Sequence, residues 1–134
     1  MAKKKYTFID LFAGCGGLSE GFLQTGKYEG LAHIEWELPM VKTLRQRLIE
    51  RWKHSEEDAI KRVIKFDIQK ITELFNGNWS EETKKLYETD NHPLIVKKGL
   101  DGLIGKKRVD LIIGGPPCQA YSIAGRAQDP NSMK

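Results

Sequence analysis

The two cysteines are the strongest nucleophiles in this 134-residue sequence, and Cys118 has the more unusual surroundings. It lies in the run Gly-Pro-Pro-Cys-Gln at 115–119, directly after the apolar run 109–113. Proline fixes φ, so this loop can hold a thiol in place at a low entropy cost. A nucleophilic thiol needs nearby cations or free amides to stabilise its thiolate, and Arg126 is the nearest cation in the sequence. We therefore predict that Cys118 is a catalytic nucleophile.

Cys15 and the three histidines define the alternatives to this prediction. Cys15 lies in a glycine-rich run, and a single cysteine of this kind is expected to be a small buried side chain. A cysteine hydrolase would need a histidine base, but no motif ties His33, His54 or His92 to Cys118. The two cysteines lie far apart and predict neither a disulfide framework nor a metal site, which fits a reducing cytoplasm.

A glycine-rich turn near the N-terminus could bind a second reactant. Gly14, Gly16 and Gly17 follow the apolar run 6–11 and precede a segment of helical periodicity. A strand, a tight turn and a helix in this order place free helix amides at the carboxyl end of a parallel strand, where such sheets bind ligands. Further along, Glu35 ends the second apolar run, where a carboxylate can accept both hydroxyls of a ribose. The turn and the carboxylate together indicate a ligand that contains adenosine.

Two cofactor classes fit this pattern. A nicotinamide dinucleotide site would need glycine or alanine at position 19, and the chain has Ser19 there, which disfavours this class. Trp36 could stack on an adenine ring. Asp67, at the end of the third predicted strand, could accept a hydrogen bond from the adenine amino group.

Alternating strands and helices must position these residues. The predicted strands are 6–11, 30–36, 62–66 and 109–113, and the predicted helices are 18–25, 39–52, 68–75 and 80–88. Such alternation implies an α/β fold in which helices cover both faces of a parallel sheet. The run 109–113 is apolar apart from Asp110 and is expected to be a strand that is buried on both faces. The polar stretch between Phe75 and Lys107 is expected to leave the core.

Three of the predicted helices have recognisable features. Leu18, Phe22 and Leu23 have helical spacing in the first. Ser80 is expected to cap the helix that ends near Glu88. In the second helix, Pro39 belongs to the first turn and four apolar residues share one face: Val41, Leu44, Leu48 and Trp52.

The composition is typical of one globular domain. Lysine and arginine exceed aspartate and glutamate by 22 to 18, and the net charge of +4 suits a polyanionic partner without demanding one. No apolar stretch predicts a signal peptide or a membrane span. No strand is predicted after Gly114, so the sheet is expected to be incomplete at its C-terminal side.

Two runs resemble the signatures of a known family. Phe-Ile-Asp-Leu-Phe-Ala-Gly-Cys-Gly-Gly at 8–17 resembles the first signature of cytosine-5 DNA methyltransferases, and the run at 115–119 resembles their catalytic signature. The dipeptides at 35–36 and 67–68 fall between them, where the family has its ribose and adenine contacts. Tyr121 stands where phenylalanine is usual in the loop that follows the cysteine.

This resemblance implies a Rossmann-like fold that binds S-adenosylmethionine and acts on double-stranded DNA. Cys118 would add to carbon 6 of a cytosine flipped out of the duplex, and carbon 5 would then accept the methyl group. Gln119, Ser122 and Arg126 would contact the DNA. Single-module members of the family usually belong to bacterial restriction-modification systems. The residues implied for cofactor binding are Phe12, Gly14, Gly16, Gly17, Glu35, Trp36, Asp67, Ile68 and Pro116.

The resemblance covers nearly the whole chain and leaves 72–107 as an insertion of unknown role. The family's Glu-Asn-Val and arginine-rich signatures, its target recognition region and its last cofactor helix normally follow the point at which this sequence stops. Two other hypotheses therefore stay open. One is a module that binds S-adenosylmethionine but needs a second chain or a C-terminal half, and the other is a nicotinamide oxidoreductase.

Overall fold

Four parallel strands form the sheet at the centre of the molecule. The computed structural model describes residues 4–115. The strands are β1 (Tyr6–Asp10), β2 (Tyr28–Glu35), β3 (Val63–Lys65) and β4 (Leu111–Ile113), arranged in the order β3-β2-β1-β4. Every neighbouring pair is parallel, so all four carboxyl ends lie at one edge of the sheet. The predicted α/β fold is confirmed, and each predicted strand is present with slightly different bounds.

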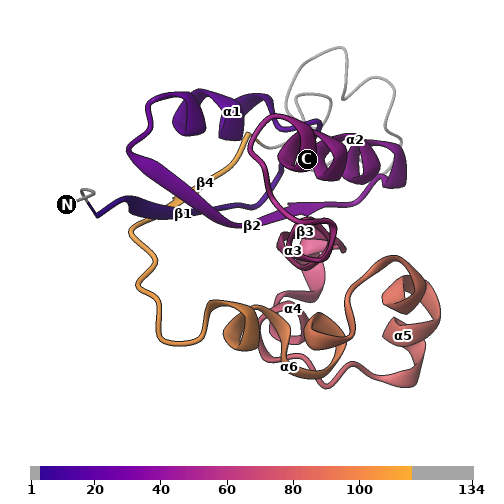
Figure 1. The fold of residues 1–134 in the computed structure, drawn as a ribbon. Coiled ribbons are helices and arrows are strands. Elements are labelled where there is room, and N and C mark those ends of the chain that lie inside the picture. The colour runs from indigo at the N-terminus through magenta and orange to yellow at the C-terminus, as the bar shows by residue number, and fades with distance from the viewer. Residues whose placement is uncertain (1–3, 116–134) are drawn as a thin grey trace, which may run out of the picture.

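Helices cover both faces of this sheet. In chain order they are α1 (Gly17–Gln24), α2 (Leu38–Glu50), α3 (Glu56–Arg62), the 3-10 helix η1 (Ile68–Lys70), α4 (Ile71–Asn76), α5 (Glu81–Tyr87), the 3-10 helix η2 (Glu88–Asp90) and α6 (Pro93–Ile104). Figure 1 shows α1 and α2 on one face and α4, α5 and α6 on the other. Two of these helices, α3 and α6, were not predicted. Within the described range, no helix is both long and apolar enough to cross a membrane.

The inner face of α2 agrees with the sequence prediction, whereas that of α1 differs from it. Pro39 lies in the first turn of α2 as expected. In α1, Leu18 is 45% exposed, and Ser19 is fully buried instead. Because α1 begins at Gly17, its second residue points outward and the row that faces the sheet starts at Ser19. Three apolar side chains of α2 are buried as predicted: Val41, Leu44 and Leu48.

The segment 72–107 builds the helical layer on the second face. The ring of Trp79 lies 4.8 Å from that of Phe66, which follows β3, and the ring of Tyr87 lies 5.0 Å from Phe66. Ser80 caps α5 as predicted. The expectation that this stretch leaves the core is wrong, because its short helices turn their polar residues outward and their apolar residues inward. Its status as an insertion stays a prediction. Its buried apolar residues are Leu74, Trp79, Tyr87, Ile95, Val96 and Leu100.

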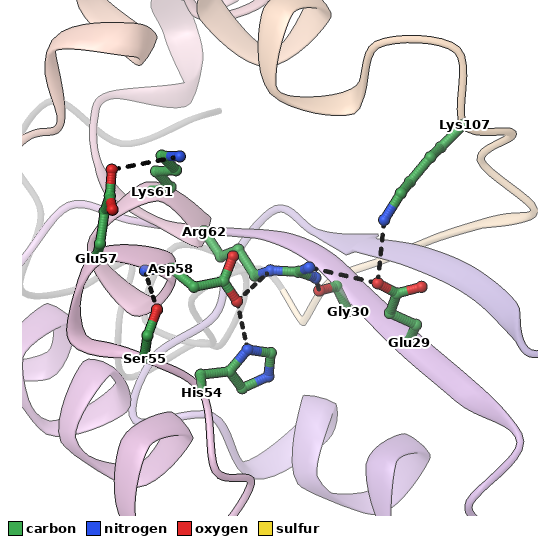
Figure 2. Close-up of polar contacts among 9 residues, drawn as sticks. All are labelled: Glu29, Gly30, His54, Ser55, Glu57, Asp58, Lys61, Arg62 and Lys107. Atoms are coloured by element: carbon green, nitrogen blue, oxygen red, sulfur yellow. Dashed lines mark hydrogen bonds and ion pairs between the residues drawn. The ribbon is translucent and has the colours of Figure 1, made fainter.

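A network of charged side chains holds α3 to the beginning of β2, as Figure 2 shows. Arg62 donates to the carbonyl of Gly30 at 2.6 Å and pairs with Asp58 at 2.9 Å and Glu29 at 3.3 Å. Asp58 also lies 2.5 Å from Nδ1 of His54. The side chain of Arg62 is only 15% exposed, so solvent screens these contacts less than those of surface ion pairs. The network therefore fixes α3 against the sheet.

The two outer strands of the sheet have different edges. On β3, the Asn91 side chain accepts from the Lys65 amide at 3.0 Å and donates to the Lys65 carbonyl at 2.9 Å, so a side chain satisfies the open edge. On β4, Leu111 and Ile112 are 36% and 57% exposed. The predicted burial of 109–113 on both faces is thus wrong for these two residues, because within the described residues β4 is a short outer strand that pairs only with β1.

Candidate functional site

Glu35 ends β2 at the carboxyl edge of the sheet, and two backbone amides orient its carboxylate. Oε1 accepts from the amide of Gly14 at 3.0 Å, and Oε2 accepts from the amide of Glu37 at 2.6 Å. Each carboxylate oxygen can accept a second hydrogen bond. The half-buried Glu35 side chain is therefore held in one orientation and can still receive two donors, such as the two hydroxyls of a ribose.

Backbone hydrogen bonds from both neighbouring strands hold the turn between β1 and α1 at this edge. The amide of Leu11 donates to the carbonyl of Ile113 at 3.0 Å, and the amide of Ala13 donates to the carbonyl of Ile34 at 2.9 Å. In the described part of the chain, the amides of residues 17 and 18 donate to no protein group. Such amides at the beginning of a helix can bind a polar or anionic group.

Glycines allow tight packing at this edge. Gly14 and Gly16 have φ of 58° and 95°, a conformation that L side chains rarely adopt. A Cβ on Gly114, directly after β4, would lie 2.9 Å from Cδ2 of Phe12. The half-buried Phe12 ring therefore lies against the residue that follows β4, and glycine at position 114 makes room for it. No sequence pattern predicted this contact.

Trp36, Asp67 and Ile68 follow the carboxyl ends of the next two strands. Trp36 is 65% exposed, so its ring offers a free face for stacking. Asp67 is half-buried and accepts from the amide of Gln69 at 2.9 Å. Ile68 packs against the larger core cluster. Among residues 4–115, those predicted to bind a cofactor thus follow the carboxyl ends of β1, β2 and β3, which meet at one edge because the strands are parallel.

A buried polar group beneath the turn was not identified from the sequence. The Ser19 hydroxyl donates to Oδ2 of Asp10 at 2.7 Å and lies 2.9 Å from Nδ1 of His33, while Oδ1 of Asp10 accepts from the Phe12 amide at 3.2 Å. Asp10 and Ser19 are fully buried, and His33 is 1% exposed. Burial raises the pKa of Asp10 and lowers the pKa of His33 to about 3, so this imidazole is neutral at pH 7. The sequence feature that could have identified this group is the presence of polar residues within strands and a helix whose neighbouring residues are apolar.

The sequence of this chain matches the model of a known protein family. A sequence model of C-5 cytosine-specific DNA methylases matches residues 6–77 and 68–133. The chain belongs to this family. The matched ranges include the turn after β1, Glu35 and the run at 115–119 that contains Cys118. The hypothesis of a nicotinamide oxidoreductase is thereby left without support.

Relatives of this chain include named type II methyltransferases. M.Bpa9945I of Bacillus paralicheniformis is 32% identical over 93% of this chain and 33% of its own length. The putative type II methyltransferase M.MjaORF1200P of Methanocaldococcus jannaschii is 32% identical over 92% of this chain and 38% of its own. M.HgiGI of Herpetosiphon aurantiacus is 30% identical over 90% of this chain and 66% of its own. The chain therefore spans little more than a third of the length of the first two relatives.

Of the two cysteines, only Cys15 lies within the described residues. Cys15 is exposed, so the expectation of a small buried side chain is wrong: it lies in the turn between two glycines of positive φ and belongs to neither core cluster. Cys118 lies outside the described residues, and its role stays a prediction. The other predicted site residues outside the described range are Pro116, Gln119, Ser122 and Arg126.

Proposed function

We propose that this protein is a DNA (cytosine-5-)-methyltransferase that transfers a methyl group from S-adenosylmethionine to carbon 5 of cytosine in double-stranded DNA. The observation that supports it best is the carboxyl edge of the sheet, where the Glu35 carboxylate is bound to the Gly14 amide and is followed by the exposed ring of Trp36. The family match continues through the Pro-Pro-Cys-Gln run at 116–119. A cofactor edge and a nucleophile motif thus occur in one chain.

The residues at this edge fit S-adenosylmethionine. The remaining acceptor capacity of Glu35 suits the two ribose hydroxyls, and the exposed face of Trp36 suits the adenine ring. Asp67 has a second carboxylate oxygen for the adenine amino group. The amides at 17–18 suit the carboxylate of the methionine part. When bound, this cofactor would supply an electrophilic methyl group. We propose that five further residues line the site: Phe12, Gly14, Gly16, Ile68 and Pro116.

Cys118 is the proposed nucleophile. Carbon 6 of cytosine is inaccessible in stacked DNA, so the base must first be flipped out of the duplex. The Cys118 thiolate then adds to carbon 6, and the electron pair of the ring double bond makes carbon 5 nucleophilic, so that carbon 5 takes the methyl group and S-adenosylhomocysteine is left. Loss of the carbon 5 proton to water restores the double bond while the bond between Cys118 and carbon 6 breaks. The sulfur leaves as a thiolate, and the enzyme is regenerated.

The proposed DNA contacts come from the residues around the cysteine. Gln119 and Ser122 are proposed to contact the DNA, and Arg126 is proposed to pair with a phosphate. The relatives are named type II methyltransferases, which supports a role for this protein as the modification enzyme of a bacterial restriction-modification system. We retain the segment 72–107 as a proposed insertion.

A mechanism-based trap tests the nucleophile. Duplex DNA with 5-fluorocytosine carries fluorine in place of the carbon 5 proton, so the covalent adduct between enzyme and DNA cannot break down. The full-length protein, incubated with this DNA and S-adenosylmethionine, is expected to form a complex that survives denaturing electrophoresis. Cys118→Ala should form none. Cys15→Ala, which removes the other cysteine of this sequence, should react like the wild type. A complex that persists in Cys118→Ala excludes Cys118 as the nucleophile.

A second candidate is a cofactor-binding module that needs a further polypeptide for activity. It is favoured by the 33% and 38% of the relatives' lengths that the chain spans, and by the exposed apolar side chains of β4 among the described residues. On this hypothesis the 134-residue chain binds S-adenosylmethionine but forms no trapped complex. Methyl transfer by this chain alone would exclude the second candidate.

A further inference from the structure

Three buried polar side chains connect β1, α1 and β2 beneath the proposed cofactor turn. Asp10 ends β1, Ser19 lies in the first turn of α1, and His33 lies near the end of β2. The contacts between them are 2.7 Å and 2.9 Å, and Asp10 also accepts from the Phe12 amide. A buried polar group without a partner costs about 1 to 3 kcal/mol, so this arrangement is held by its hydrogen bonds. None of the three side chains has a role in the proposed reaction.

The protons of this group can be assigned from the hydrogen-bonding capacity of its members. Ser19 has one proton and donates it to Asp10, so its contact with His33 requires Nδ1 of the imidazole to be the donor. The other ring nitrogen, Nε2, lies 2.8 Å from the position of a Cβ on Gly30, and Arg62 donates to the Gly30 carbonyl. Burial and the charge of Arg62 lower the His33 pKa to about 3, so the ring carries a single proton at pH 7 and Nε2 is bare when Nδ1 holds that proton. His33 is therefore the tautomer with its proton on Nδ1.

We propose that Ser19 and His33 are positioning residues that hold the cofactor turn: His33 donates to Ser19, Ser19 donates to Asp10, and Asp10 holds the Phe12 amide. This inference rests on the proposed function, since the turn is the proposed cofactor site. Glu35 holds the same turn from the solvent side through Gly14, whereas this chain of hydrogen bonds holds it from the buried side. The amides of Phe12 and Gly14, on the two sides of residue 13, are thus both hydrogen-bonded to carboxylates, and this restricts the conformations of the turn.

The hydrogen bond to the Phe12 amide also fixes the position of the Phe12 ring at the end of β4. The Phe12 ring lies against Gly114, which directly precedes the proposed catalytic run at 115–119. Fixing the Phe12 backbone therefore fixes the contact between the cofactor turn and the end of β4. Loosening it is expected to weaken cofactor binding before it affects the remainder of the sheet.

Charged groups around the hydrogen-bonded side chains Asp10, Ser19 and His33 determine how these hydrogen bonds respond to pH. Asp10 faces Glu35 of β2, whose charge adds to the effect of burial in raising the Asp10 pKa, while the hydrogen bond from Ser19 lowers it. His33 faces Arg62 of α3 and His54 of the preceding loop, which disfavour its protonation in addition to burial. Removal of the Ser19 hydroxyl should therefore raise the Asp10 pKa further, and a protonated Asp10 accepts the Phe12 amide less well.

Nuclear magnetic resonance of the full chain tests the assignment directly. Long-range proton–nitrogen spectra of the imidazoles, assigned with a His33→Phe variant, should show His33 with its proton on Nδ1. The Phe12 amide should exchange with solvent at least about tenfold faster in Ser19→Ala than in the wild type, and close to the wild-type rate in Ser19→Thr, which keeps the hydroxyl. A proton on Nε2, or an unchanged Phe12 exchange rate in Ser19→Ala, overturns the proposal.

Titration with S-adenosylmethionine between pH 8 and pH 5 separates positioning from simple loss of packing. In Ser19→Ala the Kd should rise about tenfold and should begin to rise at a higher pH than in the wild type, with recovery in Ser19→Thr. An equal loss at every pH overturns the positioning role. If the wild-type chain binds no S-adenosylmethionine, the proposed function fails, whereas the exchange rates and the tautomer still decide whether the hydrogen-bond chain holds Phe12.

Discussion

Asp10 and Glu35 are carboxylates that end neighbouring strands, and their surroundings give them different roles. Asp10 is fully buried, and burial raises its pKa. Glu35 is half-buried, and both of its oxygens accept backbone amides while keeping room for further donors. A buried carboxylate such as Asp10 can accept hydrogen bonds only from the protein around it. A half-buried one such as Glu35 can also accept them from a ligand. Residue type alone does not separate these two roles.

Replacement of Glu35 tests the ligand role. Glu35→Gln keeps the shape but removes the charge and one acceptor, so we expect the Kd for S-adenosylmethionine to rise about 10-fold to 100-fold, the range of charge-assisted hydrogen bonds. Isothermal titration calorimetry measures this change. Glu37→Gln is the matched control, because Glu37 contributes only its backbone amide to the site. Equal effects of the two substitutions would contradict a ribose contact by Glu35.

The buried His33 predicts how stability depends on pH. Its pKa is about 3 in the folded protein and 6.5 in a free chain, so between these values the unfolded state binds a proton that the folded state does not. The resulting stability is complete above pH 6.5 and decreases as the pH falls toward 3, by at most about 1.4 kcal/mol per pH unit. Urea unfolding at several pH values measures the slope. A His33→Phe variant should show a shallower slope, and an unchanged slope would contradict a neutral His33.

At the scale of elements, α4 and α6 cross at two glycines. A Cβ on Gly99 would lie 2.5 Å from the backbone nitrogen of Gly77 and 2.5 Å from the carbonyl oxygen of Phe75. Backbone atoms cannot move aside as a flexible side chain can. Gly99 also has φ of 61°, in the left-handed region, so both space and conformation require glycine.

Gly99→Ala should therefore separate the two helices. We expect the free energy of unfolding to fall by about 2 to 4 kcal/mol, because overpacking adds to the backbone strain. Gly105→Ala is the control: Gly105 has φ of 60° but no atom within 4 Å of the added Cβ, so it should show the cost of backbone strain alone, about 1 kcal/mol. Urea unfolding gives both values. Equal losses would mean that the close crossing is absent.

The contacts of Arg62 and Asp58 between α3 and β2 contribute to the free energy of unfolding, and this contribution depends on pH. Burial by itself would raise the Asp58 pKa, but the hydrogen bonds from His54 and Arg62 outweigh it and lower the Asp58 pKa below 3.8. This part of the stability is present above pH 3.8 and is lost as the pH falls further.

Arg62→Met should lower the free energy of unfolding by about 2 to 4 kcal/mol at pH 7, because it leaves charged partners unpaired. Lys61→Met, in the same helix, removes an ion pair with the exposed Glu57 and should change stability by less than about 0.5 kcal/mol. Chemical unfolding at pH 7 compares the two variants. Similar losses in both would show that the network in Figure 2 does not anchor α3.

At the scale of the whole molecule, the sheet has two covered faces and two unequal edges. The segment 72–107 covers one face, and α1 and α2 cover the other (Figure 1). Asn91 pairs with the outer edge of β3, whereas β4 presents exposed apolar side chains within the described residues. The apolar sequence of β4 is therefore no guide to its burial in this chain.

Two isoleucines on the outer strands test this difference. Ile64 of β3 is fully buried, so Ile64→Ala should cost about 2 to 5 kcal/mol of unfolding free energy. Ile112 of β4 is 57% exposed, so Ile112→Ala should cost less than about 1 kcal/mol. Urea unfolding of the 134-residue chain gives both values. A large loss in Ile112→Ala would mean that β4 is covered in solution.

The sequence by itself determined the order of the four strands and of α1, α2, α4 and α5, the family resemblance and the position of Glu35 at a strand end. These features depend on local periodicity, on turn residues and on short motifs, all of which are visible within a few neighbouring residues. It did not identify α3, which has only 7 residues, or α6, whose interior holds Gly99 and Gly102, residues that disfavour a helix.

Only the tertiary structure decided that Ser19 rather than Leu18 faces the sheet, that 72–107 belongs to the core and that β4 is an outer strand. The physical reason is that burial is a relation between residues far apart in the sequence. The bonds that join Asp10 to Ser19 and Ser19 to His33 arise because the sheet places β1 beside β2 and α1 against both.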